Sequence, residues 1–174
     1  MAVLPILEYP DKRLREPARP VEAVTPEIQR LVDDMAETMY AAPGVGLAAN
    51  QVGVLLRIFV IDTAGEDDPS DLKVFINPEI TSREGEMVWQ EGCLSFPGVT
   101  ESVERAERVH VRALDRDGKP FELDAEGLLS VAVQHENEHL DGKLMIDKLG
   151  PVKKRLVQRK MQKRAEGRTS SVDG

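Results

Sequence analysis

The sequence predicts an α+β fold in which mostly antiparallel β-sheets surround a central buried helix, with a further helix at the C-terminal end. Three patterns support this class: a helical pattern precedes the strands, short β-branched segments gather in the middle of the chain, and two helical patterns follow them. This order differs from the regular alternation of strands and helices in parallel sheets. The 174 residues are enough for a single domain with its own hydrophobic core.

The first expected element is an amphipathic helix that begins after Thr25. This residue suits the N-cap, and Pro26 suits the first helical position, where its missing N–H would have no intrahelical partner. Apolar side chains then recur at helical spacing, at Ile28, Leu31, Val32, Met35 and Met39. We expect this helix to end before Pro43.

Short strands are expected from Arg57 onward. The segments RIFVID, KVFINP and VHVRAL are rich in β-branched residues, and the Asp-Gly pair in DRDGKP predicts a hairpin turn toward FELDA. His110 alternates with the valines of VHVRAL, which places it on the polar face of its strand. We therefore expect this histidine to be exposed and to belong to no functional site.

A closing helix is expected from Pro151 to about residue 166, with Leu156 as its clearest apolar residue. Residues 151–174 carry eight Lys and Arg against two acidic residues, a net charge of +6, which leaves −14 on residues 1–150. A basic segment on an acidic body indicates an anionic partner. We expect one domain over residues 1–166 and a disordered tail over residues 167–174.

The remaining composition indicates a protein of the cytoplasm. A single cysteine, Cys93, excludes an internal disulfide and is typical of a reducing compartment. The first residues lack the basic start and unbroken apolar stretch of a signal peptide. No window approaches the ~18 consecutive apolar residues of a transmembrane helix. We therefore expect a soluble, cytoplasmic protein without a membrane partner.

The stretch QHENEHL combines two of the chain's three histidines with a glutamate, directly after the apolar run LLSVAV. In a helix, His135 and His139 share one face, and Glu136 lies about 100° around the axis. Two imidazoles so placed can bind a divalent metal while the carboxylate transfers protons. Solvated or core histidines are the ordinary alternative, but chance would produce this pattern in only about one in a few hundred such chains. We therefore expect a metal site.

Two histidines hold a metal poorly, so a third protein ligand is needed. Cys93 is the only thiol, and its segment QEGCLSFPG has the polar, Gly- and Pro-punctuated character of a strand end. By itself, a lone cysteine is more often an inert buried residue. The incomplete histidine pair nevertheless favours ligation. One thiolate and two imidazoles leave a fourth position open for water, which is typical of a catalytic site.

A glycine-containing segment, PGVGLAANQVG, offers groups that could stabilise a developing negative charge. Gly44 and Gly46 permit close approach of the backbone to an extended ligand, and Gln51 supplies an amide donor. Each donor aimed at an oxyanion contributes on the order of 3 kcal/mol. A dinucleotide-binding role is excluded, because a helix rather than a strand is expected before these glycines.

Three segments together, GVGLAANQ at 44–51, EGCLS at 91–95 and QHENEHL at 134–140, resemble the signature motifs of bacterial peptide deformylases. The flanking stretches LEYPDKRLR and RALDRDGKPFEL are also similar to the family, so the likeness covers most of residues 1–150. The resemblance implies an α+β fold with the histidine helix at its centre. It also implies removal of the N-formyl group from the first methionine of nascent proteins, with release of formate.

The resemblance further implies the roles of the reacting groups. One divalent metal ion, typically Fe²⁺, would be held by Cys93, His135 and His139, although Zn²⁺, Ni²⁺ or Co²⁺ would suit the same ligands. Glu136 would be the catalytic acid and base, which accepts a proton from water and returns it to the leaving nitrogen.

Substrate and partner contacts are implied by the same resemblance. Gln51 and the backbone N–H of Leu94 would bind the formyl oxygen. A glycine-flanked segment would pair with the peptide like an added strand, and aliphatic side chains would form the methionine pocket. The basic C-terminal helix would dock on the ribosome, where rRNA phosphates would meet its cations. The substrate-binding candidates are Gly44, Val45, Gly46, Gly92, Leu128 and Val131.

One residue departs from the family pattern, and two other functions compete with deformylation. The third motif usually reads His-Glu-x-Asp-His, whereas Glu138 stands here in place of the aspartate. We expect this change to affect the geometry around the metal ligands and the metal affinity, with activity retained. A zinc peptidase shares His-Glu-x-x-His but ordinarily takes a His or Glu as its third ligand. A binding module whose metal only holds the fold would unfold on chelation.

Overall fold

The computed structural model describes residues 2–65 and 67–173, with the side chains of that part described up to residue 167. Its helices are α1 (Pro26–Ala41), α2 (Gly127–Leu140) and α3 (Pro151–Asp173), with short 3₁₀ helices η1 (Lys12–Arg15), η2 (Ala49–Val52) and η3 (Met145–Lys148). The strands are β1 (Gly46–Ala48), β2 (Ile58–Ile61), β3 (Lys73–Glu84), β4 (Met87–Cys93), β5 (Phe96–Arg105), β6 (Arg108–Leu114) and β7 (Pro120–Glu126).

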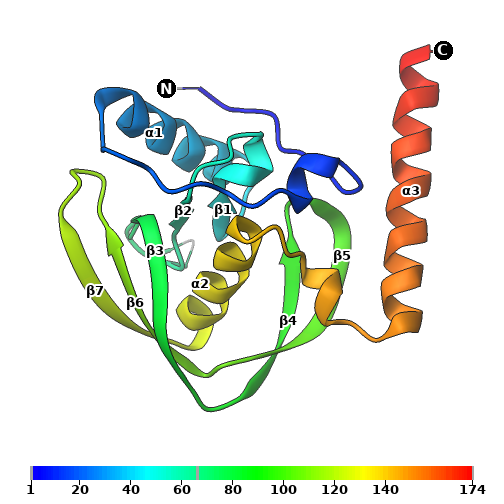
Figure 1. The fold of residues 1–174 in the computed structure, drawn as a ribbon. Coiled ribbons are helices and arrows are strands. Elements are labelled where there is room, and N and C mark those ends of the chain that lie inside the picture. The colour runs from blue at the N-terminus through cyan, green and yellow to red at the C-terminus, as the bar shows by residue number, and fades with distance from the viewer. Residues whose placement is uncertain (1, 66, 174) are drawn as a thin grey trace.

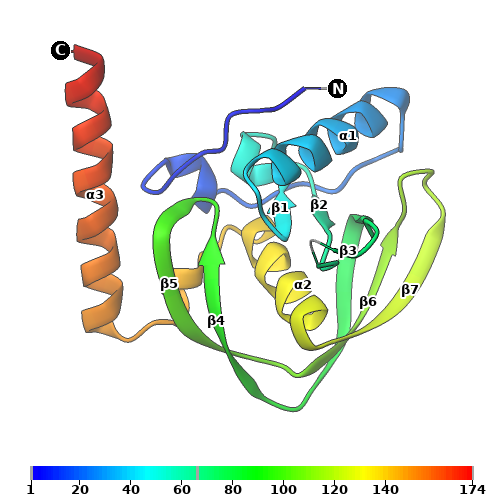
Figure 2. The ribbon, with the colours of Figure 1, turned by 180° about the vertical axis from the view of Figure 1, so that it is seen from behind.

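The strands form two antiparallel sheets on either side of α2. Five strands pair in the order β1-β2-β3-β6-β7, and β4 pairs only with β5 in a separate hairpin. Figures 1 and 2 show α2 between the five-stranded sheet and this hairpin. The predicted α+β class, with a central helix and mostly antiparallel sheets, is confirmed.

Helix α2 is buried on nearly all sides. Ten of its fourteen residues are buried, which an ordinary amphipathic surface helix could not accommodate. Its apolar residues Val133 and Leu140 join the core that contains Phe59 and Phe75 of the large sheet. Two polar side chains in its first half, Ser130 and Gln134, make hydrogen bonds to the backbone of one residue, Ala106, in the turn between β5 and β6. The side chains of Ser130 and Gln134 are therefore buried and paired at the same time.

The predicted elements before α2 are largely confirmed. The Thr25 side chain accepts a hydrogen bond from the Ile28 N–H at the start of α1, and Val32, Met35 and Met39 are buried beneath it. The three β-branched segments are strands β2, β3 and β6, although β3 continues beyond KVFINP to Glu84. The hairpin turn between β6 and β7 is present where the Asp-Gly pair predicted it.

Helix α3 begins at Pro151 as expected but continues past residue 166 to Asp173. It contacts the body through Val157 and Met161, which pack against a core cluster with Phe96 and Ile146. Leu156, the apolar residue singled out in the sequence, is instead 57% exposed, because residues four apart at 157 and 161 form the inner face. Side chains from residue 168 onward lie outside the described residues, so the expected disorder of 167–174 stays a prediction.

The helices of the described residues include none with the length and apolar character needed to cross a membrane.

Candidate metal centre

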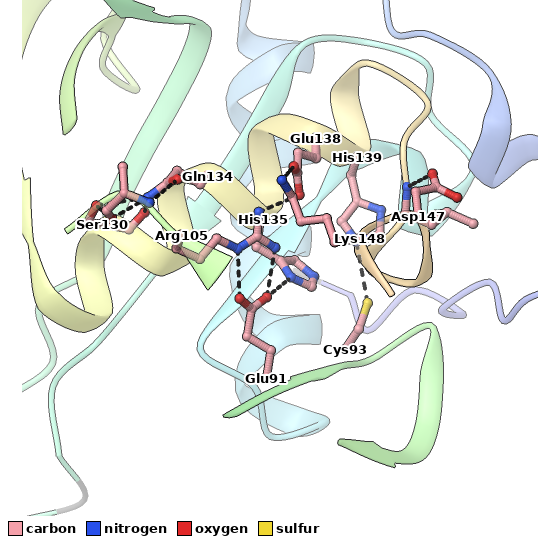
Figure 3. A network of polar contacts seen from close by, with 12 residues as sticks. Glu91, Cys93, Arg105, Ser130, Gln134, His135, Glu138, His139, Asp147 and Lys148 are labelled. Atoms are coloured by element: carbon pink, nitrogen blue, oxygen red, sulfur yellow. Dashed lines mark hydrogen bonds and ion pairs between the residues drawn. The ribbon is translucent and has the colours of Figure 1, made fainter. Parts of the chain in front are cut away.

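Three potential ligand side chains meet between α2 and the end of β4 (Figure 3). His135 and His139 project from the same side of α2, with their ring centroids 5.0 Å apart. Cys93, at the end of β4, places its Sγ 3.4 Å from His139 Nε2. One donor atom from each of the three residues lies within 4.8 Å of the others. This group is therefore able to hold one metal ion.

The surroundings of the three residues fit a divalent cation. A thiolate and two imidazoles suit borderline divalent ions and leave a fourth coordination position free. Glu136 Oε1 and His139 Nδ1 are buried without a hydrogen-bond partner among the described residues. Such unpaired buried polar atoms are unfavourable, and a carboxylate oxygen beside the ligands needs a proton, a water or an ion. The donor set and the unpaired carboxylate oxygen thus agree with the predicted metal site.

The ring of His135 is oriented by Glu91, a residue that the sequence analysis missed. His135 Nδ1 lies 2.8 Å from Glu91 Oε1, and a carboxylate can only accept, so Nδ1 carries the hydrogen and Nε2 is available to a metal. Burial raises the pKa of Glu91, but hydrogen bonds from Arg105 and His135 outweigh it and lower the pKa to about 2. Glu91 is two residues before Cys93 on the same strand face, which is the signal that could have revealed it.

Arg105 is the second missed residue. It is 3% exposed and grips Glu91 with two nitrogens, Nε at 2.7 Å from Oε2 and Nη2 at 2.8 Å from Oε1. The guanidinium is satisfied because Glu138 accepts from its third nitrogen, Nη1, at 2.6 Å. Nothing in the spacing of the sequence points to Arg105, since its position depends on the pairing of β4 with β5.

Glu136 lies beside Gly46 of β1. A Cβ at Gly46 would stand 2.7 Å from Glu136 Oε2, so this strand position requires glycine. Burial raises the pKa of Glu136 to about 7, with a smaller opposing effect from the charge of His135. A carboxyl group with such a pKa can both accept and return a proton near neutral pH.

The two histidines differ in electrostatic setting. Burial lowers the pKa of His139 well below its usual range, and the positive charges of His135 and Arg105 act in the same direction, so this ring is neutral as a ligand requires. Burial also opposes a charge on His135. There the negative charges of Glu136 and Cys93 outweigh burial and raise the pKa well above 6.5. The acidic groups beside His135 therefore favour positive charge on that side of the ligand group, whereas the His139 side favours a neutral ring.

Gln51 is held in place beside the cysteine. Its Oε1 accepts from the Ala48 N–H at 2.9 Å, while its Nε2 lies 3.1 Å from Ser95 Oγ and 3.7 Å from Cys93 Sγ. Because the carbonyl end is anchored by the backbone, the amide nitrogen points toward the ligand group. Ser95 is a further residue of this region that the sequence analysis did not single out.

A cavity of about 660 Å³ opens beside the ligand group. Apart from His139, which is buried behind the wall, every site residue predicted from the sequence lines it. Trp89, the chain's single tryptophan, was not predicted but also lines the cavity. Trp89 shares the inner face of β4 with Glu91 and Cys93, which follow at intervals of two residues. The lining residues among the predictions are Gly44, Val45, Gly46, Gln51, Gly92, Cys93, Leu94, Leu128, Val131, His135 and Glu136.

His110 lies apart from this centre. It is on β6, where its ring contacts Asp124 Oδ1 at 2.6 Å and Glu122 Oε1 at 3.1 Å on the neighbouring strand. Its side chain is 30% exposed, less than expected for a fully solvated residue. It contributes no ligand to the group of Cys93, His135 and His139.

Comparison with known proteins places this geometry in a family. Residues 3–155 match the model of the polypeptide deformylase family. The chain is 58% identical to a peptide deformylase of Alkalilimnicola ehrlichii, over 94% of this chain and 91% of the relative, and 56% identical to peptide deformylase 2 of Xanthomonas campestris, over 94% and 96%.

Solved structures agree with these relatives. A peptide deformylase from Legionella pneumophila superposes with a TM-score of 0.90 at 49% identity, covering 97% of this chain and 98% of that one. A peptide deformylase from Ehrlichia chaffeensis in complex with actinonin has a TM-score of 0.90 at 38% identity, covering 94% and 98%. The chain therefore belongs to the peptide deformylase family, metal-dependent hydrolases that remove the N-formyl group from nascent peptides.

Proposed function

We propose that Cys93, His135 and His139 hold one Fe²⁺ ion with which this deformylase, in the cytoplasm, removes the formyl group from the initiator methionine of new chains. The observation that carries the proposal is the meeting of these three side chains beside Glu136 at the wall of an open cavity. Fe²⁺ is the ion that the family resemblance implies. When bound, the ion supplies a Lewis acid that makes a water molecule acidic near neutral pH and polarises the formyl group.

Glu136 transfers the protons in this reaction. Its carboxylate takes a proton from the attacking water and returns it to the nitrogen that leaves as the free amine of methionine. Its buried position beside the ligands supports this role, and so does its pKa of about 7, because a weaker or stronger acid would perform one of the two transfers poorly.

Gln51 and Leu94 provide the donors for the formyl oxygen. The amide of Gln51 is directed toward Cys93, and Leu94 follows the cysteine directly in the chain and lines the same cavity, which supports both roles. Donors fixed before the reaction stabilise the developing oxyanion without reorganisation, and each contributes about 3 kcal/mol.

The peptide lies in the cavity between β1 and the β4 hairpin. β1 is an edge strand of the large sheet among the described strands, and Gly44, Val45 and Gly46 line the cavity, which supports pairing with an extended peptide. Gly92 faces the peptide from β4. Leu128 and Val131, which lie two turns and one turn before His135 on α2, form an apolar wall for the methionine side chain.

The proposed reaction is tested with one peptide carrying formyl-Met, acetyl-Met or an unblocked Met. The iron-loaded enzyme, purified without oxygen, should release formate from the first and leave the others intact. Cleavage of an internal peptide bond would instead assign the chain to the zinc peptidases. Metal analysis of the same preparation determines whether Fe²⁺ or another ion supports the activity.

A second part of the proposal concerns the ribosome and rests on α3. Several cations of this helix are engaged within the molecule: Lys160 bonds to the Gly98 carbonyl, and Arg164 pairs with Glu8. Three others, at intervals of four residues, have no such partner within the described part of the chain and form an exposed stripe. Phosphates of rRNA are the anions that such a stripe would meet at the ribosome. The stripe consists of Arg155, Arg159 and Lys163.

Co-sedimentation with ribosomes tests this docking at several salt concentrations. Changing Arg155, Arg159 and Lys163 together to Gln should weaken binding and reduce its salt dependence. The matched control changes Lys160 and Arg164 to Gln. Because these two side chains are bound to Gly98 and Glu8 within the protein, their loss should weaken ribosome binding less. Unchanged binding of the stripe variant would contradict docking through α3.

A further inference from the structure

A line of charged side chains leads away from the metal ligand His135, between α2 and the β4–β5 hairpin (Figure 3). It starts at Glu91, passes through Arg105 to Glu138 on α2, and ends at Lys148 of η3. Among the described residues, the two outer members have polar contacts with Arg105 and with each other but none with His135 itself. Each link is an ion pair or a charge-assisted hydrogen bond, which is stronger than a neutral one.

The inner links determine the orientation of every group. Two nitrogens of Arg105 bind both oxygens of Glu91, and the remaining Nη1 binds Glu138 Oε1 at 2.6 Å. A buried guanidinium with three occupied nitrogens cannot rotate without breaking a bond. Glu91 Oε1, held in this way, accepts from His135 Nδ1 at 2.8 Å and leaves Nε2 for the metal.

The outer links balance charge. Glu91 and Glu138 together carry one negative charge more than Arg105 neutralises. Lys148 Nζ lies 3.1 Å from Glu138 Oε2 and compensates that charge at the rim. Without Glu138, Glu91 would be the one carboxylate paired with Arg105, so the guanidinium would draw Glu91 more strongly away from His135.

We propose that Glu138 and Lys148 are positioning residues for His135, acting through Arg105 and Glu91, and that they set how firmly the protein retains its metal ion. The proposal rests on the proposed function only in taking Cys93, His135 and His139 as the ligands. Groups that orient a metal-bound histidine typically change metal affinity by about 10- to 100-fold when they are altered.

The length of the Glu138 side chain has a specific use in this arrangement. Its two oxygens serve different cations: Oε1 binds Arg105, and Oε2 binds Lys148. A side chain shorter by one methylene, attached at the same point of α2, would have to give up part of this reach. Glu138 thus extends the line from the hairpin to η3.

The test measures the loss of Co²⁺ from the loaded full-length protein into excess EDTA, followed by the visible absorption of the Co²⁺–thiolate site. Glu138→Gln should release the ion about 10- to 100-fold faster than the parent. Lys148→Met should accelerate release about two- to fivefold, since it removes a half-exposed pair. Glu138→Asp, which retains the charge, should restore most of the retention lost in Glu138→Gln.

Lys154→Met is the matched control. Lys154 is as exposed as Lys148, 37% against 39%, and also pairs with a carboxylate, Asp147 at 3.4 Å, but that carboxylate has no link to Arg105. The Lys154→Met variant should release Co²⁺ at the same rate as the parent. In the double variant, Lys148→Met should add nothing to Glu138→Gln, because the lysine acts only through the glutamate.

The absorption bands of the Co²⁺ site should also shift in Glu138→Gln, since a reoriented imidazole changes the ligand field. Parent-like release and spectrum in Glu138→Gln, or equal effects of Lys148→Met and Lys154→Met, would overturn the proposal. If Glu138→Gln fails to fold, the comparison of the two lysine variants decides. Release is measured without substrate, so a failure of the proposed reaction would be recognised separately by the formate assay.

Discussion

Two histidine–carboxylate clusters in this protein have nearly the same local geometry and different surroundings. His135 Nδ1 is 2.8 Å from Glu91, and His110 Nδ1 is 2.6 Å from Asp124. The first pair is buried, with side chains 8% and 4% exposed, whereas the second is open to solvent, at 30% and 82%. Only the buried histidine is accompanied by a thiol and a second imidazole. A short contact alone therefore does not identify a functional histidine; burial and convergent ligands do.

The largest effect should come from removing the Cys93 thiol, a ligand that the exposed histidine cluster does not have. Cys93→Ala leaves the buried site with histidines and carboxylates only, so metal content should fall from one ion per chain to near zero and deformylation should disappear. Metal analysis after gel filtration measures this. His110→Ala is the control and should retain the full metal content. A Cys93→Ala protein that kept one ion per chain would show that the ligand set is wrong.

A smaller but still large effect should follow from Glu136→Gln. The substitution retains shape and should leave the metal bound, but it removes proton transfer, so kcat/KM should fall by about 10²- to 10⁴-fold. Steady-state release of formate together with metal content measures both halves of the expectation. Full activity with a normal metal content would remove this carboxylate from the mechanism.

The two carboxylate partners can be compared directly through stability. Glu91→Gln weakens a buried ion pair and leaves Arg105 partly uncompensated, so the metal-free protein should lose about 3 kcal/mol of unfolding free energy. Asp124→Asn alters an exposed pair and should change the unfolding free energy far less. Urea titration of both proteins without metal provides the measurement. Equal effects would mean that burial is not what separates the clusters.

The smallest effect concerns the protonation of His110. Hydrogen bonds to Asp124 and Glu122 raise its pKa above 6.5. A raised pKa in the folded state means that the stabilisation is fully present below pH 6.5 and is lost as the pH rises through the folded-state pKa. The stability difference between the parent and His110→Gln should therefore shrink above pH 6.5, and 1 M salt should reduce it at every pH. An NMR titration giving a pKa at or below 6.5 for this ring would contradict the expectation.

The parts of the site that could be predicted share a local origin. His135, Glu136 and His139 occupy neighbouring turns of a single helix, and their relative directions follow from helix geometry alone. The glycines and Gln51 were recognised through their motif and then appeared at the cavity wall. Glu91, Arg105 and Trp89 could not be placed in the same way. Their positions depend on how the β4–β5 hairpin is registered and how it packs on α2.

The amino-acid sequence by itself determined the class of fold, the metal-binding helix and the identity of the only available thiolate, because these follow from residue type and short-range spacing. The meeting of Cys93 with the histidines was predicted from the sequence and is present in the fold, whereas the tertiary structure alone decided that Arg105 stands between Glu91 and Glu138. It also decided that Val157 rather than Leu156 faces the body from α3. The physical reason is that contacts between elements distant in the sequence are set by strand register and side-chain packing. Neither the strand register nor the packing between distant elements can be derived from a local pattern of residues.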